Sequence, residues 1–369
     1  MSNDNKQLSI IFMGDIALND DYNNFYISGR VPFAEVRPIL SDADFVVGNL
    51  ECFARGSKGT NPLRECALGA EPETLNYLSD LNLGLVGLAN NHAYDNLDDG
   101  FSSTISILDA FGVKHIGASQ SGNESQSFIL DKSGIRVGIL NYVAKDTHPR
   151  PYPGASILLN WFDNSKAAND IAQLKKDVDI VIVFPHWGGK MEGSMFPDKD
   201  LISTARNLID AGADLIVGHH SHTLQPYEIY RGKYIYYSLG NFCFSDVYKK
   251  GQISQADYKR TRSSALLRVV INEDGYKVDC IGIRNTGELI VPDYGGGGNK
   301  CKKLFPRYKW LYCKPVWYAY NFYEKNVYKI VRYFFSNNRN PLRQLLKVKP
   351  AMFLKTLSNL RKTFVSKVK

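Results

Sequence analysis

Short apolar runs in the first 220 residues of this chain each end in polar side chains. Runs of four to eight such residues predict buried strands. Five are predicted, over residues 8–14, 45–48, 85–89, 180–185 and 215–218, and the polar residues that follow them are Asp15, then Asn49 and Glu51, then Asn90, Asn91 and His92, then His186 and Trp187, and finally His219, His220 and His222. Because ligands bind beyond the carboxyl ends of the strands in an open α/β sheet, these side chains are expected to converge.

Helical spacing of apolar residues fills the intervals between these strands. It predicts helices over residues 72–81, 97–111, 163–176 and 198–211. Later in the chain, apolar residues alternate in twos around Arg231-Gly232 and Asp274-Gly275. This pattern predicts two hairpins, over residues 227–237 and 265–283, which are expected to close a second sheet.

The densest group of imidazoles is Gly218-His-His-Ser-His222. In an extended segment residues i and i+2 point the same way, so His220 and His222 are expected to face one place and His219 another. Histidine is the commonest metal ligand. Hydrogen bonding in a polar loop explains an isolated His-x-His equally well, and it is the other polar strand ends that favour a metal site here.

The residues expected to face the site combine carboxylate, amide and imidazole groups. They are Asp15, Asn49, Glu51, Asn91, His92, His186, His220 and His222. This set suits Mn²⁺, Zn²⁺, Fe or Mg²⁺, and it contains no thiolate that would mark a structural zinc site. The six cysteines form no Cys-x-x-Cys pair and are expected to be reduced. The pattern therefore predicts a catalytic centre with one or two divalent ions.

Taken together, the motifs closely resemble the CapA family of bacterial capsule proteins, which is associated with poly-γ-glutamate synthesis and is similar to the calcineurin-like metallophosphoesterases. They are Gly14-Asp15, Asn49-Leu50-Glu51, Ala89-Asn90-Asn91-His92 with Asp95, His186-Trp187-Gly188, Gly212-Ala213-Asp214, Gly218 to His222 and Tyr237 to Phe242, in matching order over roughly residues 8–285. The resemblance implies a four-layer α/β/β/α sandwich carrying a metal site, over residues 1–290.

The resemblance also implies roles for individual residues. It places Asp15, Asn49, Glu51, Asn91, His186, His220 and His222 among the metal ligands. His92 is then the general acid, oriented by Asp95. Apart from the resemblance, Asn241 in the tight Leu-Gly-Asn-Phe turn is expected to line the pocket. Two plainer readings stay open: Asp95 caps the helix that starts near Asn96, and Asn241 is simply a turn residue.

Three positions depart from the related patterns. The superfamily usually has Asp-x-His where this chain has Asp15 followed by Ile16 and Ala17, so one ligand of the first metal is missing. Where the superfamily has a bridging aspartate, this chain offers Asn49 or Glu51, and only Glu51 carries the charge that a bridge needs. The position four after His186 is usually Glu in the CapA pattern and is Lys190 in this chain, a cation that favours an anionic substrate.

Water activated by a divalent cation is the expected nucleophile. The predicted function is therefore that of a metal-dependent hydrolase, acting on a phosphoester or related bond in capsule or cell-envelope polymer biosynthesis. The alternative is a non-catalytic capsule assembly or export factor that keeps the fold and binds an anionic polymer.

The C-terminal residues differ sharply in charge from the rest of the chain. Residues 301–369 hold 17 Lys and Arg against the single acid Glu324, while residues 1–300 hold 28 against 36 Asp and Glu. Residues 291–300 are glycine-rich and predict a linker. Apolar residues recur at helical spacing over residues 316–334 and 353–364, beside Lys and Arg.

Basic amphipathic helices of this kind favour an anionic membrane surface. Stacking on nucleic acid and packing on the preceding domain are the alternatives. The N-terminus has no signal-peptide pattern and no apolar run is long enough to span a bilayer. A cytoplasmic protein, peripheral on the inner face of the membrane, is expected.

Overall fold

The computed structural model describes residues 6–122, 126–249, 252–255, 260–294 and 314–328. The chain divides into two compact units, residues 1–306 and 307–369, each of which is described by itself. Most of the predicted linker, Gly295 to Gly298 included, and the second amphipathic stretch at residues 353–364 lie outside the described residues.

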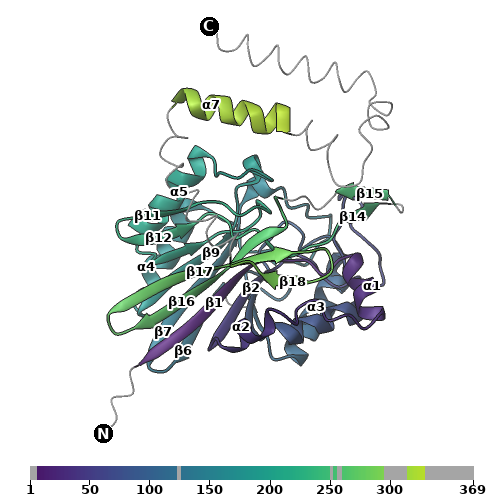
Figure 1. Cartoon of the computed structure of the whole chain (residues 1–369), viewed down its shortest axis with the longest axis horizontal. Helices are drawn as coiled ribbons and strands as arrows, with labels where there is room; N and C mark the ends of the chain where they lie inside the picture. The colour runs from purple at the N-terminus through teal and green to yellow at the C-terminus, as the bar shows by residue number, and fades with distance from the viewer. Residues whose placement is uncertain (1–5, 123–125, 250–251, 256–259, 295–313, 329–369) are drawn as a thin grey trace. The chain divides into compact units, whose positions relative to one another are not determined.

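The first sheet is built around the N-terminal strand β1 (Gln7–Ile16) (Figure 1). Strand β1 pairs in parallel with β2 (Phe45–Leu50), and β2 pairs in parallel with β3 (Leu83–Gly87). The other strands of this sheet are β4 (Lys114–Ile116), β13 (Asn241–Cys243), β16 (Ser263–Asn272), β17 (Gly275–Asn285) and β18 (Ile290–Pro292). The carboxyl ends of β1, β2 and β3 therefore lie at one edge of the sheet.

The second sheet has the order β11-β12-β10-β9-β7-β6. These strands are β6 (Ser127–Lys132), β7 (Ile135–Val143), β9 (Ile180–His186), β10 (Leu215–Val217), β11 (Tyr227–Tyr230) and β12 (Lys233–Tyr236). Strands β7, β9, β10 and β12 run parallel to one another. Two further pairs, β5 (Ala118–Ser119) with β8 (Leu158–Leu159) and β14 (Val247–Lys249) with β15 (Gln252–Gln255), are short.

Both predicted hairpins are present, but only β11–β12 belongs to the second sheet. The prediction that β16–β17 also closes that sheet is wrong. Strand β16 instead pairs antiparallel with β1, from Gln7 opposite Asn272 to Phe12 opposite Leu267. The alternating pattern of apolar residues fixes which face of a strand is buried but does not select its neighbour.

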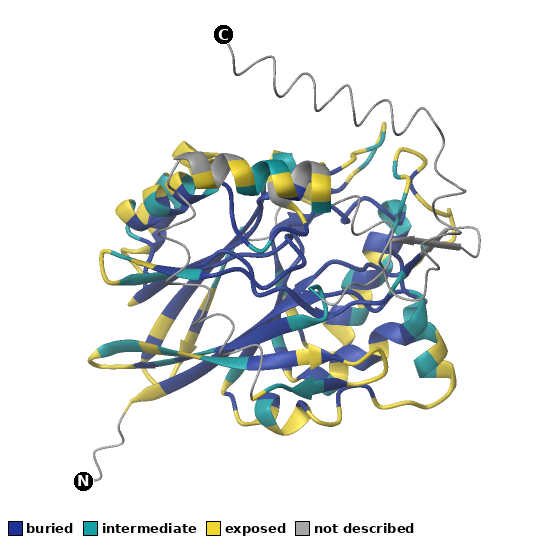
Figure 2. Cartoon of the chain, turned by 45° about the horizontal axis from the view of Figure 1, so that its top comes forward, coloured by how far each residue is buried: buried dark blue, intermediate teal, exposed yellow. Residues whose placement is uncertain are grey.

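The two sheets pack face to face between two layers of helices, which confirms the four-layer arrangement (Figures 1 and 2). A buried cluster between the sheets joins β1, β2 and β3 to β7, β9 and β10, with Phe12 and Phe184 in ring contact at 5.7 Å. The outer face of the first sheet is covered by α1 (Asp21–Ile27), α2 (Arg37–Ser41), the 3₁₀ helix η1 (Pro72–Leu81) and α3 (Leu97–Ala110).

The remaining predicted helices are α4 (Asn164–Leu174) and α5 (Lys199–Asp210), on the second sheet. The short 3₁₀ turns η2 (Lys145–Thr147) and η3 (Gly189–Met191) lie in loops. In the C-terminal unit the described segment is helix α7 (Lys314–Phe322), continued by the π-helical turn η4 (Tyr323–Tyr328). Its predicted apolar residues Val316 and Val327 are exposed within that unit.

Asp214 secures the second sheet at the amino-terminal ends of its parallel strands. Its carboxylate accepts hydrogen bonds from the Val181 amide at 2.9 Å and from Lys233 Nζ at 2.8 Å, and it also pairs with Lys175. Burial acts to raise the pKa of Asp214, but the two lysines hold it below its usual value. The carboxylate therefore stabilises the fold in its charged form.

We expect Asp214→Asn to lower the free energy of unfolding by about 2 kcal/mol at pH 7, the scale of hydrogen bonds to a charged group. Because the folded pKa of Asp214 lies below the unfolded value, this contribution is full above the unfolded pKa and disappears as the pH falls through the folded pKa. Denaturant titration at pH 7 and near pH 3 checks the difference. Asp131→Asn, at an exposed ion pair with Arg136, is the control and should cost less than about 1 kcal/mol. A loss that persists unchanged at low pH would contradict the assignment.

Candidate metal centre

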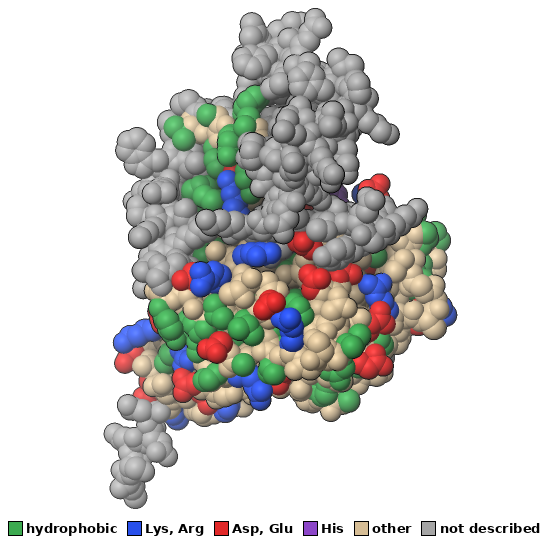
Figure 3. All heavy atoms as spheres, turned by 45° about the vertical axis from the view of Figure 1, so that its right-hand side comes forward, with side chains coloured by type: hydrophobic (Ala, Val, Ile, Leu, Met, Phe, Trp, Pro, Cys, Tyr) green, Lys and Arg blue, Asp and Glu red, His purple; other side chains and the backbone are tan. Residues whose placement is uncertain are grey.

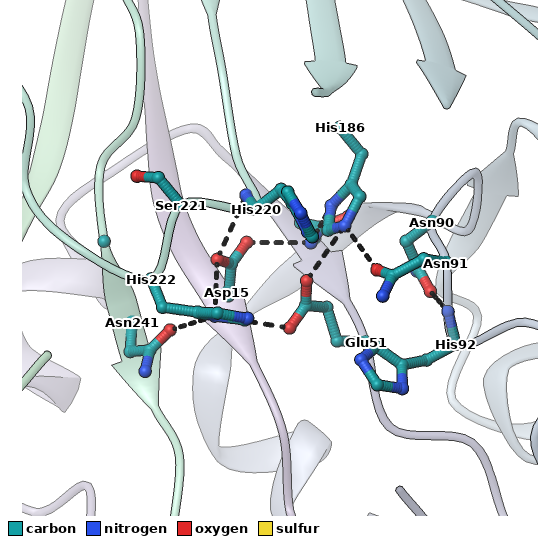
Figure 4. Close-up of polar contacts among 12 residues, drawn as sticks. Asp15, Glu51, Asn90, Asn91, His92, His186, His220, Ser221, His222 and Asn241 are labelled. Atoms are coloured by element: carbon teal, nitrogen blue, oxygen red, sulfur yellow. Dashed lines mark hydrogen bonds and ion pairs between the residues drawn. The ribbon is translucent and has the colours of Figure 1, made fainter. Parts of the chain in front are cut away.

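The polar strand ends meet where the two sheets lie together (Figure 4). Asp15 on β1 stands in register with Asn49 on β2 and with Asn241 on β13. His186, at the end of β9, forms a bridge with His219 after β10. The tips converge, but they belong to two sheets rather than to the single open sheet from which convergence was predicted, because β9 pairs with β7 and β10 and not with β3.

A close backbone approach fixes Asp15. A Cβ atom on Gly14 would lie 1.9 Å from the carbonyl oxygen of Gly240, so only glycine fits between β1 and the turn before β13. The same approach lets the Asp15 amide donate to the Gly240 carbonyl at 3.0 Å. The carboxylate of Asp15 is thereby held at the end of β1 with its side chain fully buried.

The histidine segment is not extended, contrary to the prediction. Strand β10 ends at Val217, and His220 and His222 have φ values of 91° and 57°. Both rings nevertheless face the carboxylates, with centroids 5.7 Å apart, while His219 turns away and its Nε2 donates to the Met13 carbonyl at 3.1 Å. The left-handed backbone, and not strand alternation, aims the two rings.

Glu51 is the carboxylate that the histidines share (Figure 4). His186 Nε2 lies 3.2 Å from its Oε1, and His222 Nδ1 lies 3.8 Å from its Oε2. Two groups of donor atoms, each within 4.8 Å of one another, result: Glu51 with His220 and His222, and Asp15 with Glu51 and His186. This supports Glu51 as the bridging residue.

The two buried carboxylates favour a positive charge beside them. Burial, followed by the charge of Asp15, raises the pKa of Glu51 well above its usual value. Burial also acts to raise the pKa of Asp15, but His222 and other neighbours hold it below the ordinary value. Although burial opposes a charge on His222, Glu51 and Asp15 raise the pKa of this imidazole to about 10. A cation placed among these atoms would supply the same positive charge.

His220 and His186 have the protonation state that a metal requires. Burial lowers the pKa of His220 to about 3, and burial with neighbouring imidazoles lowers that of His186 well below its usual value. Metals bind neutral imidazole. Among the described residues, neither ring nitrogen of His220 and neither carboxylate oxygen of Glu51 has a hydrogen-bond partner. Buried polar atoms without a hydrogen-bond partner lower the stability of the fold. A divalent ion bound by these atoms would satisfy them, so the donor set fits such an ion.

Three asparagines surround the charged groups and connect them. Asn49 Nδ2 donates to Asp15 Oδ1 at 2.8 Å and lies 3.3 Å from His186 Nδ1. Asn91 Oδ1 lies 2.8 Å from His186 Nε2, and Asn241 Oδ1 lies 2.9 Å from His222 Nδ1. Asn241 is therefore in the site and is more than a turn residue. The amide of Asn49 contacts the site through its nitrogen, which orients Asp15 and His186.

His92 and Asp95 form a pair beside the carboxylate cluster. His92 Nδ1 lies 2.7 Å from Asp95 Oδ2. The reading of Asp95 as a helix cap does not hold: the N-cap residue of α3 is Asn96, and no described side chain caps that position. The Asp95 carboxylate instead accepts from the Leu68 amide at 2.8 Å and pairs with Arg64 at 3.1 Å.

A cleft of about 570 Å³ opens onto these residues. Its lining includes Asn91, His92, His220 and His222 from the predicted set, with Arg64, His148, Arg150 and Glu192. Lys190 does not line it but pairs with Asp200 at 2.7 Å on the exposed surface. The expectation that Lys190 brings a cation to the site is therefore wrong, because Lys190 pairs with Asp200, whereas Glu192, two residues on, lines the cleft.

Comparison with known proteins gives one consistent family. The family model described as bacterial capsule synthesis protein PGA_cap matches residues 9–246. "Capsule biosynthesis protein CapA" of Bacillus anthracis is 28% identical over 74% of this chain and 66% of its own length, and "PGA biosynthesis protein CapA" of Bacillus subtilis (strain 168) is 31% identical over 66% and 62%. This chain therefore covers less than two thirds of either relative.

Among solved structures, a 5'-nucleotidase precursor of Thermus thermophilus is similar, with a TM-score of 0.43 and 16% identity over 85% of this chain and 59% of that chain. The family match covers more than half of the chain and agrees with the resemblance drawn from the strand-end motifs. The chain belongs to the PGA_cap family of bacterial capsule synthesis proteins.

Proposed function

We propose that this protein is a metal-dependent hydrolase of a phosphoester or related bond, acting in capsule or cell-envelope polymer biosynthesis. The observation that carries the proposal is the shared position of Glu51 between two groups of donor atoms, one with His220 and His222 and one with Asp15 and His186. A pair of divalent ions held at such a site would stabilise both the attacking and the leaving oxygens of a displacement.

The residues named above would hold the ions, with Glu51 in common and Asn91 and Asn241 beside the imidazoles. When bound, divalent ions activate water and stabilise negative charge on the oxygens of the scissile group. The chain itself keeps the carboxylates and imidazoles buried, where charge interactions are strong. It leaves one side open, through the cleft, for a substrate.

His92 is suited to move a proton. Its Nδ1 donates to Asp95, which fixes the tautomer, so Nε2 is the ring nitrogen that can exchange a proton; Nη2 of Arg64 lies 3.3 Å from it in the structure. Burial lowers the pKa of His92, while Asp95 opposes that effect. A protonated His92 therefore gives up its Nε2 proton readily, as a general acid for a leaving group must.

One position favours the non-catalytic alternative, a capsule assembly or export factor that binds an anionic polymer. Ala17 stands where the resemblance to the metallophosphoesterases implies a histidine ligand, and this residue is fully buried with no ligand atom on its side chain. A protein of this kind can bind a metal without hydrolysing any ester. Hydrolysis assays on metal-loaded protein separate the two functions.

We expect His92→Ala to slow hydrolysis of methyl phenyl phosphate by about 10²–10⁴-fold, the usual size of general acid catalysis. Methyl p-nitrophenyl phosphate should suffer much less, because its leaving group needs little protonation. Both rates and the metal content are measured after loading with Mn²⁺. His115→Ala, at a histidine on β4 that pairs with Asp109 and does not line the cleft, is the matched control. Parallel losses of metal and rate would instead place His92 among the ligands, and no hydrolysis by the unaltered protein would favour the alternative.

We also propose that residues 301–369 bind the chain to an anionic membrane surface. The support is the net charge of +16 in this segment and the exposed apolar side chains of Val316 in α7 and Val327 in η4. On the face of the molecule drawn in Figure 3, Lys and Arg of the described residues are interspersed with Asp and Glu, without one dominant sign. In the part of the chain that the structure describes, no helix has the length and apolar character needed to cross a bilayer.

Full-length protein should sediment with vesicles rich in phosphatidylserine, at roughly 1 kcal/mol per basic residue near the surface. High salt should release only part of it, because the apolar term is not screened. A chain ending at Pro306 should stay in the supernatant, and vesicles of phosphatidylcholine alone should bind neither protein. Absence of binding at low salt would exclude the membrane proposal, whereas steep salt-sensitive binding to nucleic acid alone would favour that alternative.

A further inference from the structure

Asp95 holds more than the His92 ring. Its side chain is fully buried, and its two oxygens are divided between partners. Oδ2 lies 2.7 Å from His92 Nδ1 and 2.8 Å from the Leu68 amide nitrogen. Oδ1 lies 3.1 Å from Nε of Arg64, a residue that the sequence patterns did not single out.

Arg64 also reaches the histidine directly. Its Nη2 lies 3.2 Å from His92 Nδ1 and 3.3 Å from His92 Nε2. Because Nδ1 already donates to Asp95, the guanidinium, which has only donors, can donate to Nε2 alone, and its distance to Nδ1 is a close contact. The guanidinium group therefore lies against the ring that Asp95 holds at Nδ1.

The third nitrogen of the same guanidinium joins another loop. Nη1 donates to the His148 carbonyl at 3.2 Å. Nearby, the Asn61 side chain donates to the Arg150 carbonyl at 2.6 Å, and the Asn61 amide donates to the Asp95 carbonyl at 2.8 Å. The loops that contain residues 61–68, 90–96 and 147–150 are thus joined around His92.

We propose that Arg64 is a positioning residue that holds the imidazole of His92 in the orientation needed for proton transfer to a leaving group. The proposal rests on the proposed hydrolase function for its catalytic consequence. Each guanidinium nitrogen has a contact inside the protein, and the Arg64 side chain is only 13% exposed. The planar guanidinium can contact these partners at once, with Asp95 Oδ1 as an ion pair that lacks hydrogen-bond geometry, whereas the single ammonium of lysine cannot.

A role in binding the anionic substrate predicts different kinetics. Arg150 lines the same cleft with an exposed side chain, and a substrate-binding arginine of that kind affects KM for every ester alike. Arg64, acting through His92, should affect kcat, and most strongly for esters whose leaving group needs a proton. Its effect should also vanish when the imidazole is absent.

The kinetic test uses Arg64→Lys, which keeps a positive charge beside buried Asp95, and Arg64→Gln. In metal-loaded full-length protein, both should lower kcat for methyl phenyl phosphate, by at least about 10-fold within the range of general acid catalysis, and lower it much less for methyl p-nitrophenyl phosphate. Neither should slow the His92→Ala protein further. Arg206→Lys, at an arginine on α5 that pairs with buried Glu228, is the matched control and should keep the unaltered kcat. Additive losses, equal losses for both esters, or a change in KM alone would overturn the proposal.

A spectroscopic test needs no activity and stands if the hydrolase function itself fails. In ¹⁵N-labelled protein, the His92 ring signals, assigned by their loss in His92→Ala, should report a single Nδ1–H tautomer at neutral pH. Arg64→Gln should give a mixture of tautomers or exchange-broadened signals, while Arg206→Lys should leave the spectrum of His92 unchanged. An unaltered Nδ1–H signal in Arg64→Gln would show that Asp95 alone positions the ring and would refute the inference.

Discussion

The site depends on two carboxylates that are buried close to each other. Asp15 and Glu51 are both fully buried, and each interacts with the imidazole of His222. Two like charges in a low-dielectric interior either raise the pKa of one group, as burial and Asp15 do for Glu51, or require a positive charge beside them. Glu51 and Asp15 raise the pKa of His222 to about 10, so this imidazole carries the positive charge, and a cation bound among these ligands would take the place of its proton. The imidazoles of His186 and His220 are already neutral.

The fold supplies this arrangement by bringing two parallel sets of strands together at their carboxyl ends. The approach of Gly14 to the Gly240 carbonyl brings Asp15 in from the first sheet, and β9 brings His186 in from the second. His220 and His222 accept a left-handed backbone that costs about 1–3 kcal/mol per residue. Such strain persists where the surrounding contacts fix the chain, as the bridge between His186 and His219 does here.

Much of this could be predicted from the sequence, because strand ends and ligand chemistry are local properties. The four helical segments, both hairpin turns and the polar residues at the strand ends follow from local patterns. Convergence of these tips was predicted for one sheet, whereas the structure builds it from two. The sheet to which β16 belongs could not be predicted from local patterns, because β16 pairs with β1, which is distant in the sequence. The rings of His220 and His222 face the same place, as predicted. The reason given for it was wrong, because their backbone is left-handed and not extended.

Loop residues were the least accessible to prediction. Arg64 lies in an irregular segment without periodicity, and only folding brings it to His92. Glu192, which lines the cleft, was not predicted, because the family pattern has glutamate at the position of Lys190. Lys190 itself pairs with Asp200. The identity of a residue at an aligned position says little about its direction when a short turn such as η3 intervenes.

The central claim is that Glu51 is shared by two cation positions. The most direct measurement is anomalous diffraction from crystals of the full chain grown with Mn²⁺, compared with crystals of Glu51→Gln. The account predicts anomalous peaks on both sides of the Glu51 carboxylate, one beside Asp15 and His186 and one beside His220 and His222, and their loss in the variant. Bound Mn²⁺ that avoids Glu51, or peaks that survive unchanged in Glu51→Gln, would contradict it.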